Sequence, residues 1–353
     1  MAEQLVLKVD GQQYEGWQKV SVSQGLDALA GHFEIELSDR WSGQAEAWTI
    51  EAGSPCEIAL GDDKLMTAYV DQARYRIDSD QLTITVSGRE KTGDLIDCSA
   101  VHSPGSWTNR KLEQIAGDLA KPFGIKVKAI ASTGAAFPKF ALQQGETVSA
   151  ALDRMTRQRG LLVVTTAEGD VEIRSPGKEA AGYSLKLGET LLWAEFNNDV
   201  SERFSDYLVK GYARTKVRAG GGQPKATAKD GGTPRYRPMV LVHDEQATIA
   251  TVTARSKWEA SVRAARAREV RAGVVGWRGP NGALFRADRL VPITALPIGV
   301  DDELLIAEVQ FLLDEQGHRV ELTLTPKEAF SPEPPPAPKG KTKGRGAKPL
   351  TKS

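Results

Sequence analysis

A strand pattern that occurs twice, far apart in the chain, places the strongest constraint on the fold. Residues 65–90 alternate apolar and polar side chains through two segments and end in Arg89-Glu90. Residues 304–328 repeat this pattern, with one gap in the turn, and end in Lys327-Glu328. Alternation with period two is typical of strands with one buried face. We interpret the two stretches as copies of one β unit; the alternative is a chance similarity, because any two alternating hairpins share some of this pattern.

The first β unit is predicted to span residues 1–92. Asp10-Gly11 is a strong hairpin-turn signal between two alternating segments. Phe33, Ile35 and Leu37 alternate with polar residues, so they are predicted to face a common core. About six short strands with frequent turns favour a small barrel or sandwich.

Residues 93–182 have a different character and are predicted to form an α+β domain. Thr108 or Asn109 is predicted to begin a helix with apolar residues at helical spacing, which a proline and a glycine end. Thr147 is predicted to cap a second helix, and residues 161–173 to form a hairpin. The domain therefore combines helices with a hairpin.

The second β unit is predicted from two pieces, residues 183–212 and 289–330. Residues 29–35 of the first unit and residues 203–209 have a similar pattern of apolar and polar residues, which places residues 203–209 in the second unit. Residues 213–288 are then an insertion with a basic, glycine-rich loop and a helix. That helix is predicted over residues 247–272.

The expected fold class is thus mainly β with α+β insertions: two similar small β-barrels per chain plus a helix-and-hairpin domain. The final stretch, residues 331–353, opens with prolines, continues with lysines and glycines, and cannot bury a core. It is predicted to be disordered and to be a candidate contact for a partner. Its cationic candidates are Lys339, Lys341, Lys343, Arg345 and Lys348.

Composition excludes several classes of protein. The chain has 353 residues with 46 basic and 46 acidic side chains, so no net field attracts nucleic acid or an anionic membrane. Two cysteines make no disulfide framework and suit a reducing compartment. No signal-peptide pattern and no apolar run of about 18 residues is evident. We expect a protein that is made and folded in a cytosol and does not insert into a membrane.

The segment 88–99 connects the first β unit to the α+β domain. Asp94 and Asp97 are three residues apart, which invites an acid/base or metal interpretation. Polar residues after a glycine turn more often cap backbone groups or pair with neighbours such as Arg89 and Lys91. We therefore assign this segment a structural role and call it the seam motif. Its residues are Gly88, Arg89, Asp94, Leu95, Asp97 and Cys98.

No catalytic, cofactor-binding or metal-binding residue is predicted. No histidine has a neighbour at metal-ligand spacing, and no Gly-x-Ser-x-Gly elbow occurs. The glycine run at 220–222 lacks the lysine spacing of a phosphate loop. Trp41 and Trp48 can stack on sugars or fill the core of their own loop.

Several stretches carry a family resemblance over residues 1–328. They are residues 88–99, residues 107–112 with Ile115-Ala116, residues 122–125, and Gly145-Glu146-Thr147 leading to Arg154. The chain resembles the Mu-type phage tail baseplate hub proteins, a family similar in fold to the T-even tail hub and to the base of type VI secretion spikes. The resemblance implies a structural, non-enzymatic hub of a contractile tail: a homotrimeric ring that adapts the sixfold tail tube to the threefold central spike and forms part of the channel for genome ejection.

The resemblance also implies partners and a location. The partners are two further copies of the chain, the central spike protein, the tail tube and other baseplate proteins, with the tape-measure protein as a further candidate. DNA is met only in transit, and no cofactor is implied. The location is the virion tail baseplate, after assembly in the host cytoplasm. A receptor-binding adhesin and a cell-wall hydrolase of the tail tip remain the alternative functions.

The repeat agrees with such an adaptor, because three chains with two similar units each present six similar units around one axis. The basic loop of the insertion is expected at the ring surface, either simply solvated or facing DNA in the lumen. Its cationic residues are Arg214, Lys216, Arg218, Lys225 and Lys229.

Overall fold

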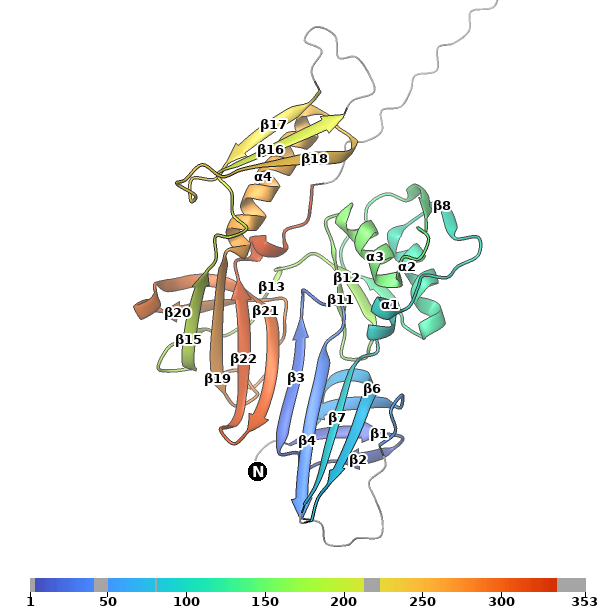
Figure 1. Ribbon diagram of the computed structural model, residues 1–353, viewed down its shortest axis with the longest axis vertical. Coiled ribbons are helices and arrows are strands. Elements are labelled where there is room, and N and C mark those ends of the chain that lie inside the picture. Colours follow the sequence, from blue (N-terminus) through green and yellow to red (C-terminus); the bar gives the residue numbers. More distant parts are fainter. Residues whose placement is uncertain (1–3, 41–49, 80, 213–222, 335–353) are drawn as a thin grey trace, which may run out of the picture.

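The structure is a computed structural model, and it describes residues 4–40, 50–79, 81–212 and 223–334. The fold is mainly β: a large sheet carries a compact α+β domain on one side and a smaller α/β lobe at one end (Figure 1). Of the helices in these described ranges, none has both the length and the apolar character that a bilayer span requires.

Fourteen strands form the large sheet. The first half of the chain contributes β1 (Leu5–Val9), β2 (Gln12–Tyr14), β3 (Lys19–Gly25), β4 (His32–Arg40), β5 (Pro55–Leu60), β6 (Asp63–Ile77) and β7 (Gln81–Glu90). The second half contributes β13 (Glu179–Ala180), β14 (Leu185–Lys186), β15 (Leu191–Asn198), β19 (Arg268–Val275), β20 (Arg289–Ala295), β21 (Val300–Asp314) and β22 (Gly317–Thr325). The Asp10-Gly11 turn joins β1 to β2 with both residues at positive φ, as the hairpin prediction requires.

The strand order of the sheet contains an internal repeat. The order β3-β4-β7-β6-β5 recurs as β15-β19-β22-β21-β20. In both copies a fifteen-residue strand, β6 or β21, pairs along its first part with the preceding strand and along its last part with the following one. The similarity between residues 65–90 and 304–328 thus corresponds to two equivalent hairpins, β6–β7 and β21–β22.

The two β units share one continuous sheet. The last part of β21 pairs with β3, from Glu308 opposite Gly25 to Leu313 opposite Val20. Within the described residues neither unit closes on itself, so the expectation of two small barrels was wrong. The physical reason is that β3, whose free edge would have had to close the first unit, finds its partner in the second. One hydrophobic core accordingly runs through both units.

The second β unit contains different strands from those that the sequence alignment predicted. Residues 203–209, aligned with residues 29–35, lead into β16 (Asp206–Tyr212), which pairs in a separate sheet. The counterpart of β4 in the large sheet is instead β19, which the alignment left in the insertion. Period-two alternation alone could not distinguish these two candidate strands.

The helix predicted over residues 247–272 is shorter than expected. It is α4 (Ile249–Arg266), and the chain turns directly into β19 afterwards. Val270, Ala272 and Val274 are buried on one face of β19, which is strand rather than helix spacing. The sheet core therefore determines the conformation of this segment more strongly than its alanine and arginine content does.

The α+β domain follows β7. Its elements are α1 (Gly93–Asp97), β8 (Ser106–Arg110), α2 (Leu112–Ala120), β9 (Val127–Ala129), β10 (Phe137–Ala141), α3 (Val148–Arg157), β11 (Leu162–Thr165) and β12 (Val171–Arg174). Thr147 caps α3 as predicted, because its Oγ1 accepts a 3.2 Å hydrogen bond from Ala150 N. The predicted start of α2 at Thr108 or Asn109 was wrong: both residues lie in β8, and Lys111 is the N-cap. Pairing with β10 holds the residues of β8 in a strand conformation instead of a helix.

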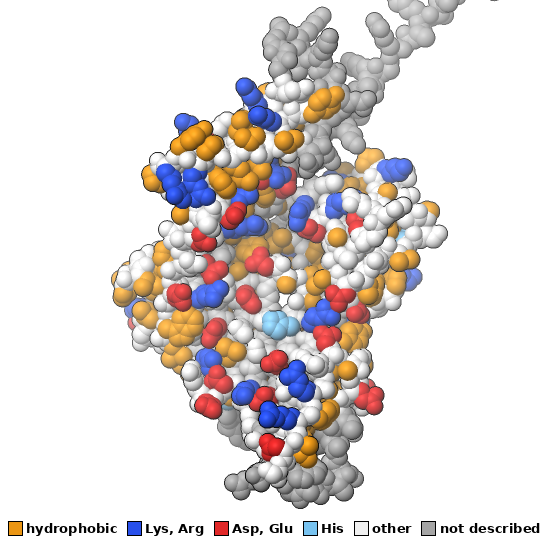
Figure 2. Space-filling model, viewed as in Figure 1, with side chains coloured by type: hydrophobic (Ala, Val, Ile, Leu, Met, Phe, Trp, Pro, Cys, Tyr) orange, Lys and Arg blue, Asp and Glu red, His pale blue; other side chains and the backbone are white. Residues whose placement is uncertain are grey.

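The smaller lobe consists of three strands and α4. The strands are β16, β17 (Lys225–Lys229) and β18 (Pro238–Gln246), in the order β17-β16-β18. Helix α4 packs on one face of this sheet around Val209, Ala247 and Val252. Figure 2 shows basic and hydrophobic side chains gathered on this lobe. The lobe thus has a small core of its own.

The chain leaves the large sheet through a short 3₁₀ turn, η3 (Lys327–Phe330), which lies against α4. The indole Nε1 of Trp258 donates a hydrogen bond to Ser331 O. The first residues of the tail that was predicted to be disordered, 331–334, therefore belong to the described fold. The cationic candidates of that tail lie outside the described residues: Lys339, Lys341, Lys343, Arg345 and Lys348.

Candidate functional site

The seam motif is an ion-pair junction between three elements. Arg89, near the end of β7, donates through Nε to Asp71 of β6 at 2.7 Å. Another nitrogen of the same guanidinium lies 2.8 Å from the carboxylate of Asp97 at the end of α1. Hydrogen bonds from Arg89 lower the pKa of Asp97, and those carboxylates raise the pKa of Arg89. An exposed carboxylate held ionised in this way is poorly suited to general acid catalysis near neutral pH.

Gly88 is a glycine for a steric reason. A Cβ at this position would lie 2.0 Å from the carbonyl oxygen of Tyr69 and 2.7 Å from the ring of Phe33. Backbone oxygen cannot move aside as a flexible side chain can, so β6 and β7 approach this closely only around glycine. The seam motif therefore begins at a tight strand contact.

The other seam residues also fulfil structural functions. Asp94 lies in the first turn of α1, and its carbonyl oxygen accepts a 2.9 Å hydrogen bond from the N–H of Cys98. Leu95 is fully buried in the core of the α+β domain. The structure thus brings the seam residues together at one junction, where each makes an ion pair, a main-chain hydrogen bond or a packing contact. Sequence reasoning missed Asp71, because only tertiary structure brings it to Arg89.

Hydrogen bonds from side chains to main-chain carbonyl oxygens strengthen the same junction. Thr67 Oγ1 of β6 donates to the carbonyl oxygen of Ala167 at 2.9 Å, and Lys91 Nζ donates to that of Gly124 at 2.7 Å. Thr92 is fully buried, with its hydroxyl 3.1 Å from the carbonyl oxygen of Leu29. The first two bonds link the first β unit to the α+β domain.

Glu90 is a buried carboxyl at the same junction. It accepts hydrogen bonds from the N–H of Gly31 at 2.7 Å and from the side-chain amide of Gln24 at 2.6 Å. Burial raises the pKa of Glu90, and the two donors partly oppose this effect. Its two oxygens thus hold the end of β3 and the following loop against the end of β7, which is a structural use of a buried acid.

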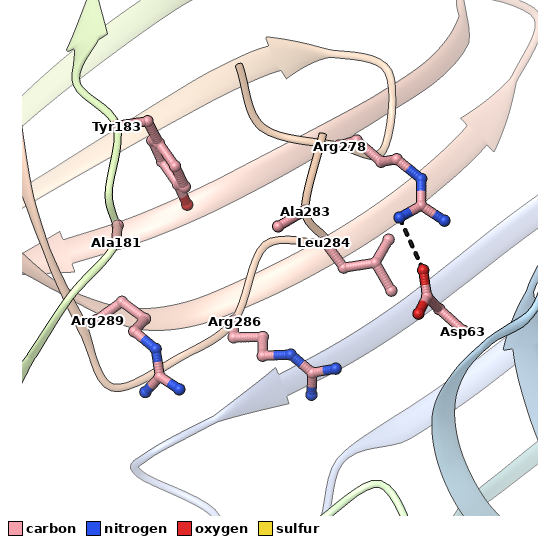
Figure 3. Close-up of a pocket in the computed structure, with 8 residues that line it drawn as sticks. All are labelled: Asp63, Ala181, Tyr183, Arg278, Ala283, Leu284, Arg286 and Arg289. Carbon is pink, nitrogen blue, oxygen red and sulfur yellow. Dashed lines mark ion pairs between the residues drawn. The ribbon is translucent and has the colours of Figure 1, made fainter. Parts of the chain in front are cut away.

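A small cavity of about 220 Å³ lies between the two β units (Figure 3). Arg278 points at Asp63 and forms a 2.8 Å ion pair with it, which ties the β19–β20 connection to the β5–β6 turn. The guanidinium groups of Arg286 and Arg289 point in a common direction, and Arg289 pairs with Glu179 at 2.8 Å. Arginine keeps its proton in proteins, so these groups recognise anions but do not transfer protons. The remaining lining residues are Ala181, Tyr183, Ala283 and Leu284.

The described residues offer no other obvious chemistry. No group of three His, Cys, Asp or Glu side chains among them is placed to hold a metal ion. Burial raises the pKa of Cys56 to about 12, so this thiol is protonated at neutral pH and is a poor nucleophile. Trp41 and Trp48, considered above for sugar stacking, lie outside the described residues.

Two strand edges of the large sheet that are equivalent by the repeat to the β21–β3 junction have no strand partner in the described structure. In the second unit, β3 pairs with the last part of β21. The equivalent edge in the first unit, along residues 71–77 of β6, has no strand partner, and these residues pair with β7 on their other side only. The other edge belongs to β15. This strand pairs with β19 on one side, and its other side has no strand partner apart from an isolated bridge at Leu191. Leu192 on β15 is 55% exposed and Ile77 on β6 is 57% exposed. Uncovered apolar strand edges are sites where another strand can add.

The basic insertion loop is only partly described. Arg214, Lys216 and Arg218 lie outside the described residues, whereas Lys225 and Lys229 are exposed on β17. These two lysines therefore lie on a strand of the smaller lobe rather than in a loop.

Three family models match successive parts of the chain. Residues 4–90 match the N-terminal domain of Mu phage baseplate assembly protein GpP-like sequences. Residues 92–175 match the second domain of baseplate hub protein gp44-like sequences. Residues 248–333 match the fourth domain of the Mu phage baseplate assembly protein GpP. Together these matches include the first β unit, the α+β domain and much of the second β unit.

Whole-chain comparisons agree with the family models. The chain is 36% identical to the baseplate hub protein gp44 of Escherichia phage Mu, over 94% of this chain and 89% of gp44. Its fold matches the 43 kDa tail protein of prophage MuSo2 from Shewanella oneidensis with a TM-score of 0.86 and 33% identity, covering 94% of this chain and all of that one.

A more distant match concerns the fold alone. An E. coli type VI secretion system component, described as similar to the T4 tail proteins gp27 and gp5, matches with a TM-score of 0.57 at 11% identity, covering 93% of this chain and 79% of that one. The identity over nearly the full length of gp44, the three domain matches and the shared fold lead to one conclusion. The chain belongs to the Mu-type phage baseplate hub proteins and is a structural component of the phage tail baseplate.

Proposed function

We propose that the protein is the hub of a contractile tail: a homotrimeric ring that adapts the sixfold tail tube to the threefold central spike and encloses part of the channel for genome ejection. Family membership supports the location in the baseplate. The repeated strand order supports the symmetry match, because three chains with two equivalent units each present six units around one axis.

The observation that carries the proposal is the pairing of β21 with β3 inside one chain. By the internal repeat, β6 is the counterpart of β21 and β15 is the counterpart of β3. The same junction can therefore form between chains, when residues 71–77 of β6 in one copy pair with β15 of the next. Three such junctions close a ring and cover both uncovered edges, which removes the aggregation hazard that they pose to a single chain.

The domain division is part of the proposal. We retain residues 1–92 as the first β unit and 93–182 as the α+β domain. The second β unit, predicted from residues 183–212 and 289–330, gains β19 and loses β16 to the smaller lobe. The seam motif then has a structural role, fixing the α+β domain on the first unit. The cationic tail beyond residue 335 is proposed to contact a partner, and the spike, tube and tape-measure proteins are the candidates.

A mass measurement tests the ring. Size-exclusion chromatography with multi-angle light scattering on the purified full chain is expected to give three chain masses. Should the ring close only around its spike, the mixture of the two proteins would give a complex with three hub chains. A monomer both alone and in the presence of the spike protein rejects the proposal.

A further inference from the structure

The three-stranded sheet of the smaller lobe has one face that no described element covers. Side chains directly opposite one another in a sheet share a face. Lys210 of β16 lies opposite both Lys225 of β17 and Val242 of β18. These residues point away from Val209, which is buried under α4. We call this the open face, and its members used below are Lys210, Tyr212, Lys225, Lys229, Val240 and Val242.

The open face exposes large apolar side chains. Val240 is 55% exposed, Val242 is 75% exposed, and Tyr212 on the adjacent strand is 57% exposed. A sheet with one face on a core normally presents polar side chains on the other. Clustered valines on that second face indicate a surface that a partner covers.

The basic side chains of the open face are an independent observation. Lys210 and Lys225 are directly opposite in the register, and Lys229 lies further along β17, opposite Asp206. None of the three lysines has an ion pair within the described residues. Like charges directly opposite in a sheet are destabilising. Two opposite lysines that form no ion pair with a described side chain, beside exposed valines, are complementary to a partner that carries both carboxylates and apolar groups.

Other occupants fit less well. If two copies of the open face met, lysines would oppose lysines across the contact, which costs free energy. A nucleic acid would pair with the lysines but would leave Val240 and Val242 against sugar and phosphate, without apolar contacts. On the basis of the proposed function, we propose that the open face docks an acidic, partly apolar segment of another tail protein.

The test uses the purified full chain and a displayed random-peptide library as the probe. Selected peptides are expected to combine Asp or Glu with Leu, Ile, Val or Phe. Their affinity is expected to fall at least about tenfold for the double variant Lys210→Glu/Lys225→Glu. A matched control, Lys121→Glu/Lys128→Glu, reverses two exposed lysines of the α+β domain and is expected to retain binding. Thermal unfolding of both variants verifies that they fold.

Several results overturn the inference. Selected peptides without acidic residues, or an affinity that the open-face variant leaves unchanged, exclude an acidic partner at this surface. Binding of a fluorescent single-stranded or duplex oligonucleotide that Lys210→Glu/Lys225→Glu abolishes, without peptide binding, assigns the face to nucleic acid. Loss of the trimer in Val242→Asp assigns it to the subunit contact. A failure of the ring itself is recognised separately, because the wild-type mass reports it without any peptide.

Discussion

The indole Nε1 of Trp258 donates a 2.7 Å hydrogen bond to the main-chain oxygen of Ser331, which holds the end of the described chain against α4. Arg255, one turn earlier on the helix, stacks over the Trp258 ring and forms an ion pair with Glu333. Arg266 donates to the carbonyl oxygen of Ala329 at 3.2 Å. Three side chains of one helix thus fix the point where the basic tail begins.

Replacing Trp258 by phenylalanine is expected to release this segment. The change removes the only N–H of the side chain and costs about 1 kcal/mol locally. Hydrogen exchange of residues 329–333 is expected to accelerate while the global unfolding midpoint changes little. Trp277→Phe is the control: it removes a comparable 2.9 Å bond to Leu312 O in the sheet and is expected to leave exchange at 329–333 unchanged. Equal exchange in wild type and Trp258→Phe contradicts the assignment.

Alanine substitutions at Gly88 and Gly117 are expected to have opposite effects on stability. Gly88→Ala places a methyl group against the Tyr69 carbonyl and is expected to cost about 2 kcal/mol or more, as overpacking does. Gly117→Ala, in the interior of α2 with open space around the added methyl, is expected to stabilise by about 0.5–1 kcal/mol. Urea unfolding measures both. A neutral Gly88→Ala shows that the strands at the seam can separate.

The ion pair between Arg89 and Asp97 predicts a pH dependence. The pKa of Asp97 is lower in the folded protein than in the unfolded chain, so its contribution to stability is present above the unfolded pKa of about 3.9. The contribution is lost as the pH falls through the lower, folded value. The wild type is thus expected to exceed Asp97→Asn in urea midpoint at pH 7, and the difference is expected to vanish in acid. A gap that persists at low pH shows that the charge of Asp97 is not the cause.

Asp230 is expected to be a carboxylate of the smaller lobe whose loss strongly destabilises the fold. It forms two hydrogen bonds with the guanidinium of Arg203, at 2.5 and 2.8 Å, and both side chains are largely buried. Asp230→Ala leaves that guanidinium without its partner and is expected to cost about 3 kcal/mol. Asp153→Ala, which breaks an exposed pair with Arg157, is expected to cost no more than about 0.5 kcal/mol. Comparable losses in the two variants contradict the importance of burial.

Leu192→Glu tests the proposed strand junction between chains. A charge on the free edge of β15 opposes strand addition, and the side chain is exposed in the single chain, so the fold is expected to survive. Light scattering is expected to detect monomers. Ile130→Glu changes a side chain of similar exposure, 47%, in the α+β domain and is expected to leave the trimer intact. Trimers of Leu192→Glu place the subunit contact elsewhere.

Local sequence signals predicted local structure well. Thr147 preceding an apolar run, and Asp10-Gly11 between alternating segments, led to a correct cap and a correct hairpin because each signal acts within a few residues. The repeated alternation identified two equivalent hairpins for the same reason.

What the sequence could not provide was long-range pairing. β3 pairs with β21 and does not close its own unit. The sequence around β3 could not predict this, because β21 lies far from it along the chain. The carboxylate that meets Arg89 on β6, Asp71, carries no sequence signal that distinguishes it from other exposed acids. The same limit placed the first part of β19 in a predicted helix, since only the completed sheet buries its alternate residues.

The junction of β21 with β3 also sets the order of events during synthesis. Ser21 and Gln310, which share a 3.0 Å hydrogen bond across this junction, are 289 residues apart. At a translation rate of about 5–20 residues per second, β3 waits on the order of 15–60 s for its partner. In a chain terminated before β21, the edge of β3 has no strand partner and the large sheet cannot form completely. The large sheet can therefore form completely only after β21 and β22 have been translated.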